Sequence, residues 1–153
     1  MNKFDINPKE IVIDTGPLLV LLSGHYGHNT ITKFGYTNDD IILLGEFLKK
    51  VTKIFITPYV LAEVSNLVNT KIEKEFFSDF INFSKYMLRG LKEEHIDKDT
   101  ILAKKELPKF GFTDASLLEA VKGNKLLLTN DLLLYYYCRN VNIPAFCLKY
   151  NIH

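Results

Sequence analysis

Four carboxylate side chains stand in apolar surroundings. Asp14 ends the run IVID, Glu63 lies in YVLAEV, Asp114 lies in GFTDASLL, and Asp131 follows LLLTN. A charged group beside an apolar core costs free energy unless it is paired, hydrogen-bonded or bound to a metal ion. Most of the other acidic residues lie in plainly polar segments such as EEHIDKD. These four residues are therefore the candidates for chemistry.

Each of the four also has a simpler explanation on its own. Asp114 or Asp131 would suit a helix N-terminus, where the helix dipole favours an acidic side chain. Asp14 would cap the turn after its strand, and Glu63 would be a surface residue of a helix. On a helical wheel, however, Glu63 borders the apolar stripe of its helix, so its carboxylate can face a cleft rather than bulk water.

Four carboxylates brought together would repel one another and raise one another's pKa values unless a cation neutralised them. No histidine or cysteine accompanies them, which favours an all-oxygen site for Mg²⁺ or Mn²⁺ over one for Zn²⁺. Such an ion activates water and stabilises the leaving oxygen of a phosphodiester. His25 and His28 have a metal-ligand spacing but lack a second ligand pair, so we interpret them as polar loop residues.

The elements that must position these side chains alternate along the chain. Continuously apolar runs predict strands that are covered on both faces, at Ile11–Ile13, Lys53–Ile56, Lys125–Leu128 and Ala145–Leu148. Helices are predicted over Asp39–Lys50, from Thr57-Pro58 onward, and over Lys74–Leu88, Asp99–Leu107, Thr113–Lys122 and Asp131–Arg139. Pro108 is expected to end the fourth of these helices, and Asp114 to open the fifth.

This alternation predicts an α/β fold, a three-layer sandwich with a mainly parallel sheet of four to five strands. In such sheets, ligands bind beyond the carboxyl ends of the strands, near the point where the strand order reverses. Asp14 and Asp131 follow two predicted strands, so we expect all four carboxylates to meet at that edge. The one long irregular segment, Ser23–Asn38, is expected to overhang the same edge.

Size and composition limit the classes of protein to be considered. The chain has 153 residues, of which 47% are hydrophobic and 24% charged, which predicts a single globular domain over 1–153. No apolar run is long enough to cross a membrane, and the N-terminus lacks the apolar core of a secretory signal, so we expect a cytoplasmic protein with reduced cysteines. A net charge of +1 requires bound cations to carry part of any attraction to nucleic acid.

The motifs, taken in order, resemble those of the PIN domain. They are DTGPLL at 14–19, Ala62-Glu63, Thr113-Asp114-Ala115 and LLTND at 127–131, and the resemblance covers the chain from Ile11 to Leu148. It implies an endoribonuclease that depends on Mg²⁺ or Mn²⁺, often a toxin of the VapC type that a protein antitoxin neutralises. By the same resemblance, Asp14, Glu63 and Asp114 are the main acidic residues, Asp131 is the fourth, and Thr129 supports Asp131 or a water molecule.

Two features depart from the family pattern. Gly16 stands where many members have Ser or Asn, and the segment Ser23–Asn38 is longer than in the smallest members. Neither departure removes a carboxylate, so both bear on substrate choice rather than on activity. We expect a homodimer that acts on RNA and that an antitoxin inhibits by inserting a basic side chain, such as Arg, among the carboxylates.

Other functions remain open at this stage. The same fold could hold RNA or a partner protein without cutting, could serve as a housekeeping RNA-processing nuclease, or could cleave DNA. Retention of all four carboxylates favours catalysis, and the small size of the chain favours RNA over DNA. A phosphatase with an aspartyl nucleophile would also place Asp after the first strand, but that class usually has a second Asp two residues later, where Gly16 stands here.

Overall fold

The structure is a computed structural model that describes residues 9–149. Strands and helices alternate along this part of the chain as the sequence predicts. Their order is β1 (Glu10–Ile13), α1 (Thr15–Tyr26), α2 (Thr30–Lys33), α3 (Asn38–Leu48), β2 (Lys53–Ile56), α4 (Pro58–Lys71), α5 (Lys74–Arg89), β3 (Lys92–Glu93), α6 (Lys98–Leu102), α7 (Leu107–Ala120), β4 (Leu126–Thr129), α8 (Leu132–Asn140) and β5 (Ala145–Cys147).

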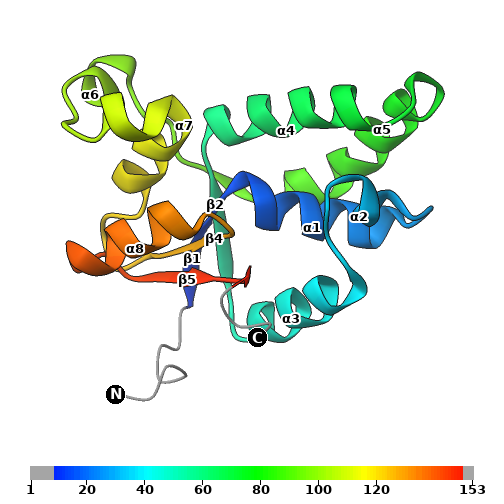
Figure 1. The fold of residues 1–153 in the computed structure, drawn as a ribbon, viewed down its shortest axis with the longest axis horizontal. Helices are drawn as coiled ribbons and strands as arrows, with labels where there is room; N and C mark the ends of the chain where they lie inside the picture. Colours follow the sequence, from blue (N-terminus) through cyan, green and yellow to red (C-terminus); the bar gives the residue numbers. More distant parts are fainter. Residues whose placement is uncertain (1–8, 150–153) are drawn as a thin grey trace.

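The five strands form one sheet in the order β3-β2-β1-β4-β5, and every pair is parallel. In the central strand, Val12 pairs with Phe55 of β2 on one side and with Leu127 of β4 on the other. Helices α1 to α5 lie on one side of the sheet, and α7 and α8 lie on the other (Figure 1). This is the predicted three-layer α/β sandwich. The strand order reverses between β1 and β4.

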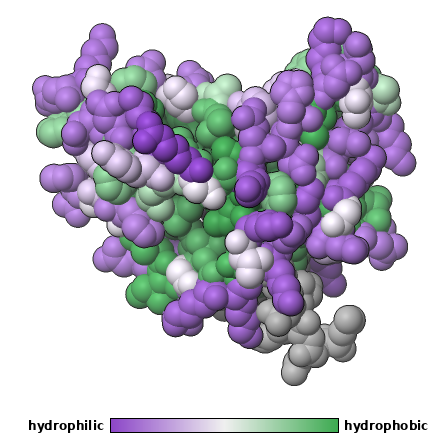
Figure 2. Space-filling model, turned by 180° about the vertical axis from the view of Figure 1, so that it is seen from behind, coloured by the Kyte–Doolittle hydropathy of each residue, from purple (hydrophilic) through white to green (hydrophobic). Residues whose placement is uncertain are grey.

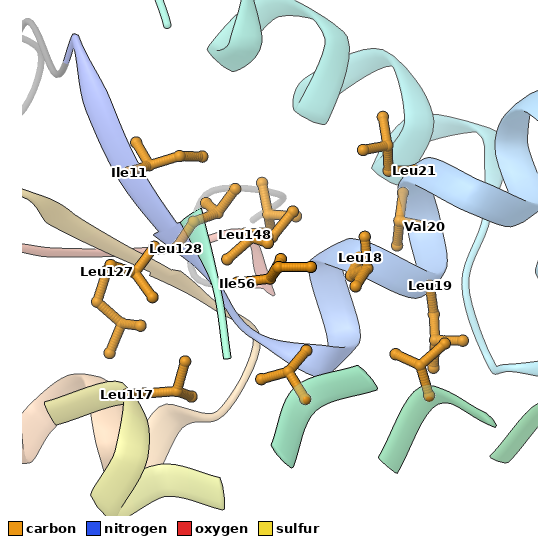
Figure 3. Packing of buried hydrophobic residues seen from close by; sticks show 14 of the residues in the cluster. Ile11, Leu18, Leu19, Val20, Leu21, Ile56, Leu117, Leu127, Leu128 and Leu148 are labelled. Atoms are coloured by element: carbon orange, nitrogen blue, oxygen red, sulfur yellow. The ribbon is translucent and has the colours of Figure 1, made fainter. Parts of the chain in front are cut away.

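The core is centred on β1, β4 and helix α1. The inner strand residues from Ile11 to Ile13 and from Leu126 to Leu128 are at most 2% exposed. Helix α1 is buried along almost its whole length, as its sequence TGPLLVLLS requires, because a helix that is apolar on every side must be covered on every side. Figure 3 shows Leu18 and Leu19 of this helix among side chains of the strands and of the neighbouring helices.

One of the predicted helices is corrected by the structure. Asp99–Leu107 is not one helix, because α6 ends at Leu102 and Pro108 lies in the first turn of α7. Proline lacks a backbone N–H group, which the first turn of a helix does not need, so Pro108 starts a helix instead of ending one. The backbone of Gly111 (φ 84°, ψ −179°) then interrupts α7. The residues after this kink form a separate helical segment, so Asp114 lies in the first turn of a helix, as the sequence predicts.

Two further differences concern short elements. Strand β3 is not among the four strands named from the sequence, because its two residues are polar and exposed. The segment Ser23–Asn38 is not irregular throughout. Helix α1 continues to Tyr26, α2 occupies Thr30–Lys33 and α3 begins at Asn38, with turns at the positive-φ residues Gly27 and Gly35 between them.

The face of the molecule in Figure 2 is mostly hydrophilic. Seen from behind, it carries a notch between two hydrophilic lobes, with hydrophobic residues on the floor of the notch (Figure 2). Between residues 9 and 149, no helix has both the length and the apolar character needed to span a bilayer. Neither Cys138 nor Cys147, both buried, forms a disulfide within the same range.

Candidate active site

Asp14 is the most buried of the four candidate carboxylates. It follows β1 as the N-cap of α1, and its Oδ1 accepts a hydrogen bond from the Thr15 backbone N–H at 2.6 Å. Its Oδ2 accepts one from the Thr129 hydroxyl at 2.7 Å. The residue is only 7% exposed. Burial raises the pKa of Asp14 from its ordinary 3.8 to about 6, although both hydrogen bonds act in the opposite direction.

Thr129 connects Asp14 to Asp131 across the point where the strand order reverses. Its hydroxyl donates to Asp14 and also accepts a hydrogen bond from the backbone N–H of Asp131 at 3.0 Å. Asp131 is the N-cap of α8, where its Oδ1 accepts from the Leu134 N–H at 3.1 Å. The helix-capping explanation of Asp131 is therefore correct for one of its oxygens. Thr129 is fully buried, so both acidic residues are attached to a fixed point of the core.

Glu63 lies in α4 and Asp114 lies in α7, and a side-chain hydrogen bond connects the N-cap of α4 to α7. The hydroxyl of Thr57, the N-cap of α4, lies 2.9 Å from the hydroxyl of Ser116 in α7, and both residues are fully buried. Thr57 also accepts from the Val60 N–H and so caps the helix, as the Thr-Pro pair predicts. This contact sets the distance between the helix that carries Glu63 and the one that carries Asp114.

All four carboxylates line one cavity of about 600 Å³ at the carboxyl edge of the sheet. Burial and, after it, the charges of Asp14, Asp131 and Glu63 together raise the pKa of Asp114 from 3.8 to about 7. The charges of Glu63 and Asp131 likewise add to the rise at Asp14. The four side chains thus lie within electrostatic reach of one another, as the sequence predicts. Like charges in a partly buried space make it an unfavourable place for ionised carboxylates alone.

The carboxylates share this cavity, but they are not close enough together to coordinate one metal ion directly. Within residues 9–149, no three His, Cys, Asp or Glu side chains are gathered closely enough to hold a metal ion as they stand. Their chemistry nonetheless fits a hard cation. The acidic side chains that line the cavity are carboxylates, and no His or Cys lines it, which suits an ion with oxygen ligands. The pKa values of Asp14 and Asp114 are raised first by burial and then by the neighbouring carboxylates, and a bound cation would oppose both effects.

Several residues that the sequence analysis did not select line the same cavity. Thr32, Lys33, Phe34, Gly35 and Tyr36 enter it from the segment between α1 and α3. That segment therefore overhangs the strand ends, as expected. The one signal in the sequence for these residues was the length of the segment itself, and nothing in its composition singled out Tyr36.

Three lysines also line the cavity: Lys33, Lys71 and Lys149. Lys33 forms an ion pair with Glu73. Asn130 lies in the cavity wall between Thr129 and Asp131, and it is 8% exposed. His25 and His28 do not line the cavity, and the His25 ring bonds to the Leu21 carbonyl of its own helix.

Comparison with family models and with curated proteins gives no match. Among solved structures, the chain is similar to a domain of a functionally unknown protein from Methanocaldococcus jannaschii DSM 2661. The two are 23% identical, the match covers 91% of this chain and 90% of that one, and the TM-score is 0.47. This similarity assigns no activity, so function is argued below from the residues of the site.

Proposed function

We propose that this chain is an endoribonuclease of the PIN-domain type that hydrolyses RNA phosphodiester bonds with Mg²⁺ or Mn²⁺. One observation carries the proposal: four carboxylates from four different elements line a single cavity at the carboxyl edge of a parallel sheet. Two of them, Asp14 and Asp114, have pKa values raised to about 6 and about 7. Burial is the main cause of both shifts and repulsion among the carboxylates adds to it, so a bound cation would favour the ionised forms.

Asp14, Glu63, Asp114 and Asp131 would hold the cation. When bound, it would supply Lewis-acid polarisation of the phosphodiester and of the attacking water. The protein's own contribution is to hold the ligands still. Asp14 is fixed through both oxygens, by Thr15 and Thr129, and Asp131 through one oxygen by the first turn of α8. Fixed ligands reduce the reorganisation that the reaction requires.

The lysines on the cavity rim suit a polyanionic substrate. Lys33, Lys71 and Lys149 would attract backbone phosphates on either side of the scissile one, while the carboxylates would repel a phosphate that arrived without a cation. Phe34, Leu19 and Leu67 supply apolar wall that displaces water. This combination favours a flexible single strand, which can lay one phosphate into the cavity.

The toxin interpretation extends this proposal to partners. We propose that the protein acts as a homodimer and is bound in the cell by an antitoxin whose Arg side chain enters among the carboxylates. A guanidinium group carries a charge of the required sign and can pair with two carboxylate oxygens at once. A cavity of about 600 Å³ has room for such a side chain.

Cleavage of single-stranded RNA by the purified protein, with and without Mg²⁺ or Mn²⁺, tests the nuclease proposal. We expect divalent-dependent cleavage that Asp14→Asn abolishes, because this substitution removes a ligand charge and keeps the shape. The matched control is Asp39→Asn, which changes an exposed residue of α3 that does not line the cavity. Cleavage by Asp14→Asn at the wild-type rate would refute the assignment of the site.

Expression of the lone chain in a bacterial host tests the toxin interpretation separately. Growth should slow with the wild-type chain and recover with Asp14→Asn or Asp114→Asn. If the wild type and both variants affect growth equally while the purified protein still cuts RNA, a housekeeping RNA-processing nuclease is the better account. If the purified protein binds RNA or a partner without cutting, the chain is a non-catalytic module.

A further inference from the structure

Gly16 lies in the first turn of α1, where the backbone does not require glycine. It is not among the positive-φ residues of the chain, and glycine inside a helix costs about 0.5–1 kcal/mol relative to alanine. A larger residue at this position would force neighbouring side chains to move. A Cβ at position 16 would lie 2.7 Å from the Tyr36 hydroxyl oxygen, and 3.2 Å from both Cβ and Nδ2 of Asn130. Gly16 thus leaves room for two polar side chains.

Tyr36 is held in place from both sides along the chain. Its backbone N–H donates to the Ile31 carbonyl at 3.2 Å, which closes the turn after α2. The next residue, Thr37, begins α3 with a capping box, in which its backbone N–H donates to Asp40 Oδ2 at 2.7 Å. The tyrosine side chain is partly buried and lines the carboxylate cavity. The backbone on both sides of Tyr36 is therefore fixed, and its side chain forms part of the cavity wall.

Asn130 has an amide group whose hydrogen-bonding capacity is unused. Among residues 9–149, neither its Nδ2 nor its Oδ1 has a hydrogen-bond partner, although the residue is only 8% exposed. The Tyr36 hydroxyl is close enough for the amide to lower the tyrosine pKa, which burial raises by a larger amount. The two groups nevertheless do not reach hydrogen-bond geometry. A buried amide without a partner costs about 1–3 kcal/mol, which a ligand that bonded to it would recover.

The two groups also complement the chemistry of the cavity. Ionised carboxylates only accept hydrogen bonds, and a phosphate oxygen also only accepts them. The phenol of Tyr36 and the NH₂ group of Asn130 are neutral donors, so they can bind an anionic oxygen without pairing permanently with the neighbouring carboxylates. Both groups pack close to Gly16, within 3.2 Å of the place that a Cβ at this position would occupy.

We propose that Tyr36 and Asn130 form a substrate-binding subsite that donates hydrogen bonds to an unesterified oxygen of the nucleic-acid backbone, and that Gly16 is present to admit them. This rests on the proposed function, because it takes the substrate to be a phosphodiester. In place of the Ser or Asn that the PIN pattern has at position 16, the polar group comes from the segment between α1 and α3.

The test compares Tyr36→Phe, Asn130→Ala, Gly16→Ala and the double variant Gly16→Ala/Tyr36→Phe. The binding probe is a fluorescein-labelled single-stranded RNA decamer, measured by fluorescence anisotropy in Ca²⁺, with a gel to verify that it stays intact. KM and kcat are measured in Mn²⁺, and melting temperatures are recorded for every variant. Tyr26→Phe is the matched control, because it removes a hydroxyl that bonds to Asp79 and does not line the cavity.

Tyr36→Phe should raise the decamer Kd and the KM by about tenfold or more, the loss expected for one hydrogen bond to a charged group. Asn130→Ala should act similarly. Gly16→Ala should weaken binding as much as Tyr36→Phe, because its methyl group displaces the hydroxyl. It should cause little further loss when Tyr36 is already Phe. Tyr26→Phe should leave Kd and KM unchanged.

If Tyr36→Phe leaves the decamer Kd unchanged, the subsite proposal is wrong. A lower melting temperature with an unchanged Kd is what a purely structural role of Tyr36 predicts. The proposal is also wrong if the losses of binding free energy caused by Gly16→Ala and by Tyr36→Phe simply add in the double variant. If the wild type binds the decamer but does not cut RNA, and Tyr36→Phe weakens binding, then the nuclease proposal fails and the subsite stands. If the wild type neither binds nor cuts, both proposals fall.

Discussion

Replacing Asp14 with Asn should stabilise the metal-free protein, and by an amount that depends on pH. The folded state raises the pKa of this carboxyl from 3.8 to about 6. The folded protein therefore keeps the Asp14 proton to a higher pH than the unfolded chain does. The free energy of unfolding is therefore highest at low pH, where the carboxyl is protonated in both the folded and the unfolded state. It falls as the pH rises from 3.8 to about 6 and stays at the lower value above that pH.

The size of this effect follows from the difference between the two pKa values. At about 1.4 kcal/mol per pH unit, ionised Asp14 costs the fold about 3 kcal/mol near pH 8. Asparagine avoids that cost and also removes a charge that raises the pKa of Asp114. Asp14 accepts one hydrogen bond at each oxygen, from Thr15 and from Thr129, and the NH₂ group of asparagine cannot accept either of them. The loss of one hydrogen bond lowers the free energy of unfolding by about 1 kcal/mol. A net gain of about 2 kcal/mol remains near pH 8.

Urea unfolding in EDTA, near pH 8 and near pH 4.5, measures this gain. The advantage of Asp14→Asn over the wild type should shrink by about 2 kcal/mol at the lower pH, where the folded wild type already holds the proton. Asp39→Asn, at an exposed position, should change the free energy of unfolding by no more than about 0.5 kcal/mol at either pH. Equal pH dependence in Asp14→Asn and the wild type would refute the reasoning.

Mg²⁺ or Mn²⁺ should raise the melting temperature by about 5–10 °C at a metal concentration of about a hundred times Kd, because the ion binds the folded cavity and not the dispersed acids of the unfolded chain. The rise should be absent in Asp14→Asn/Asp114→Asn, and a thermal scan of the wild type without any metal response would contradict it. Thr129→Val should lower the free energy of unfolding by about 1–3 kcal/mol, since this fully buried hydroxyl bonds to both Asp14 and the Asp131 backbone. It should also raise the pKa of Asp14 further, which carboxyl-carbon NMR titration can follow. A pKa unchanged by the substitution would show that Thr129 does not stabilise the charge.

The sequence was sufficient for four of the five described strands and for the carboxylates that line the cavity, because both carry strong local signals. Parallel strands covered on both faces must be continuously apolar, as in Ile11–Ile13, and a lone acid at the end of such a run is conspicuous. Strand β3 gave no such signal, since Lys92 and Glu93 are polar and exposed. Pro108 was misinterpreted because proline both ends and starts helices. The choice depends on whether the following residues continue as a helix, and Gly111 interrupted that pattern.

Tyr36 and Asn130 could not be found in this way because their importance comes from tertiary contacts. Tyr36 lies in a polar segment and Asn130 beside a more obvious Asp, and neither follows a period or a motif that marks a ligand. The fit of both around position 16 appears only when residues from three separate segments are placed together. The sequence marks Gly16 only as a departure from the PIN pattern, whereas the close contact with Tyr36, 20 residues further along the chain, is visible only in the fold.

The hydrogen bond between Thr129 and Asp14 spans 115 residues of sequence, and this has a consequence for synthesis on the ribosome. At translation rates of about 5–20 residues per second, roughly 6 to 23 seconds separate the appearance of the two partners. Until β4 emerges and pairs with β1, Asp14 lacks the hydrogen bond from Thr129, and Asp131 has not yet been added to the chain. An interrupted translation product that ends before β4 therefore holds no assembled cavity. If the protein is a nuclease, each molecule becomes able to cleave RNA only after almost all of its chain has been made. An inhibitor that is translated at the same time can therefore be present before the nuclease is active.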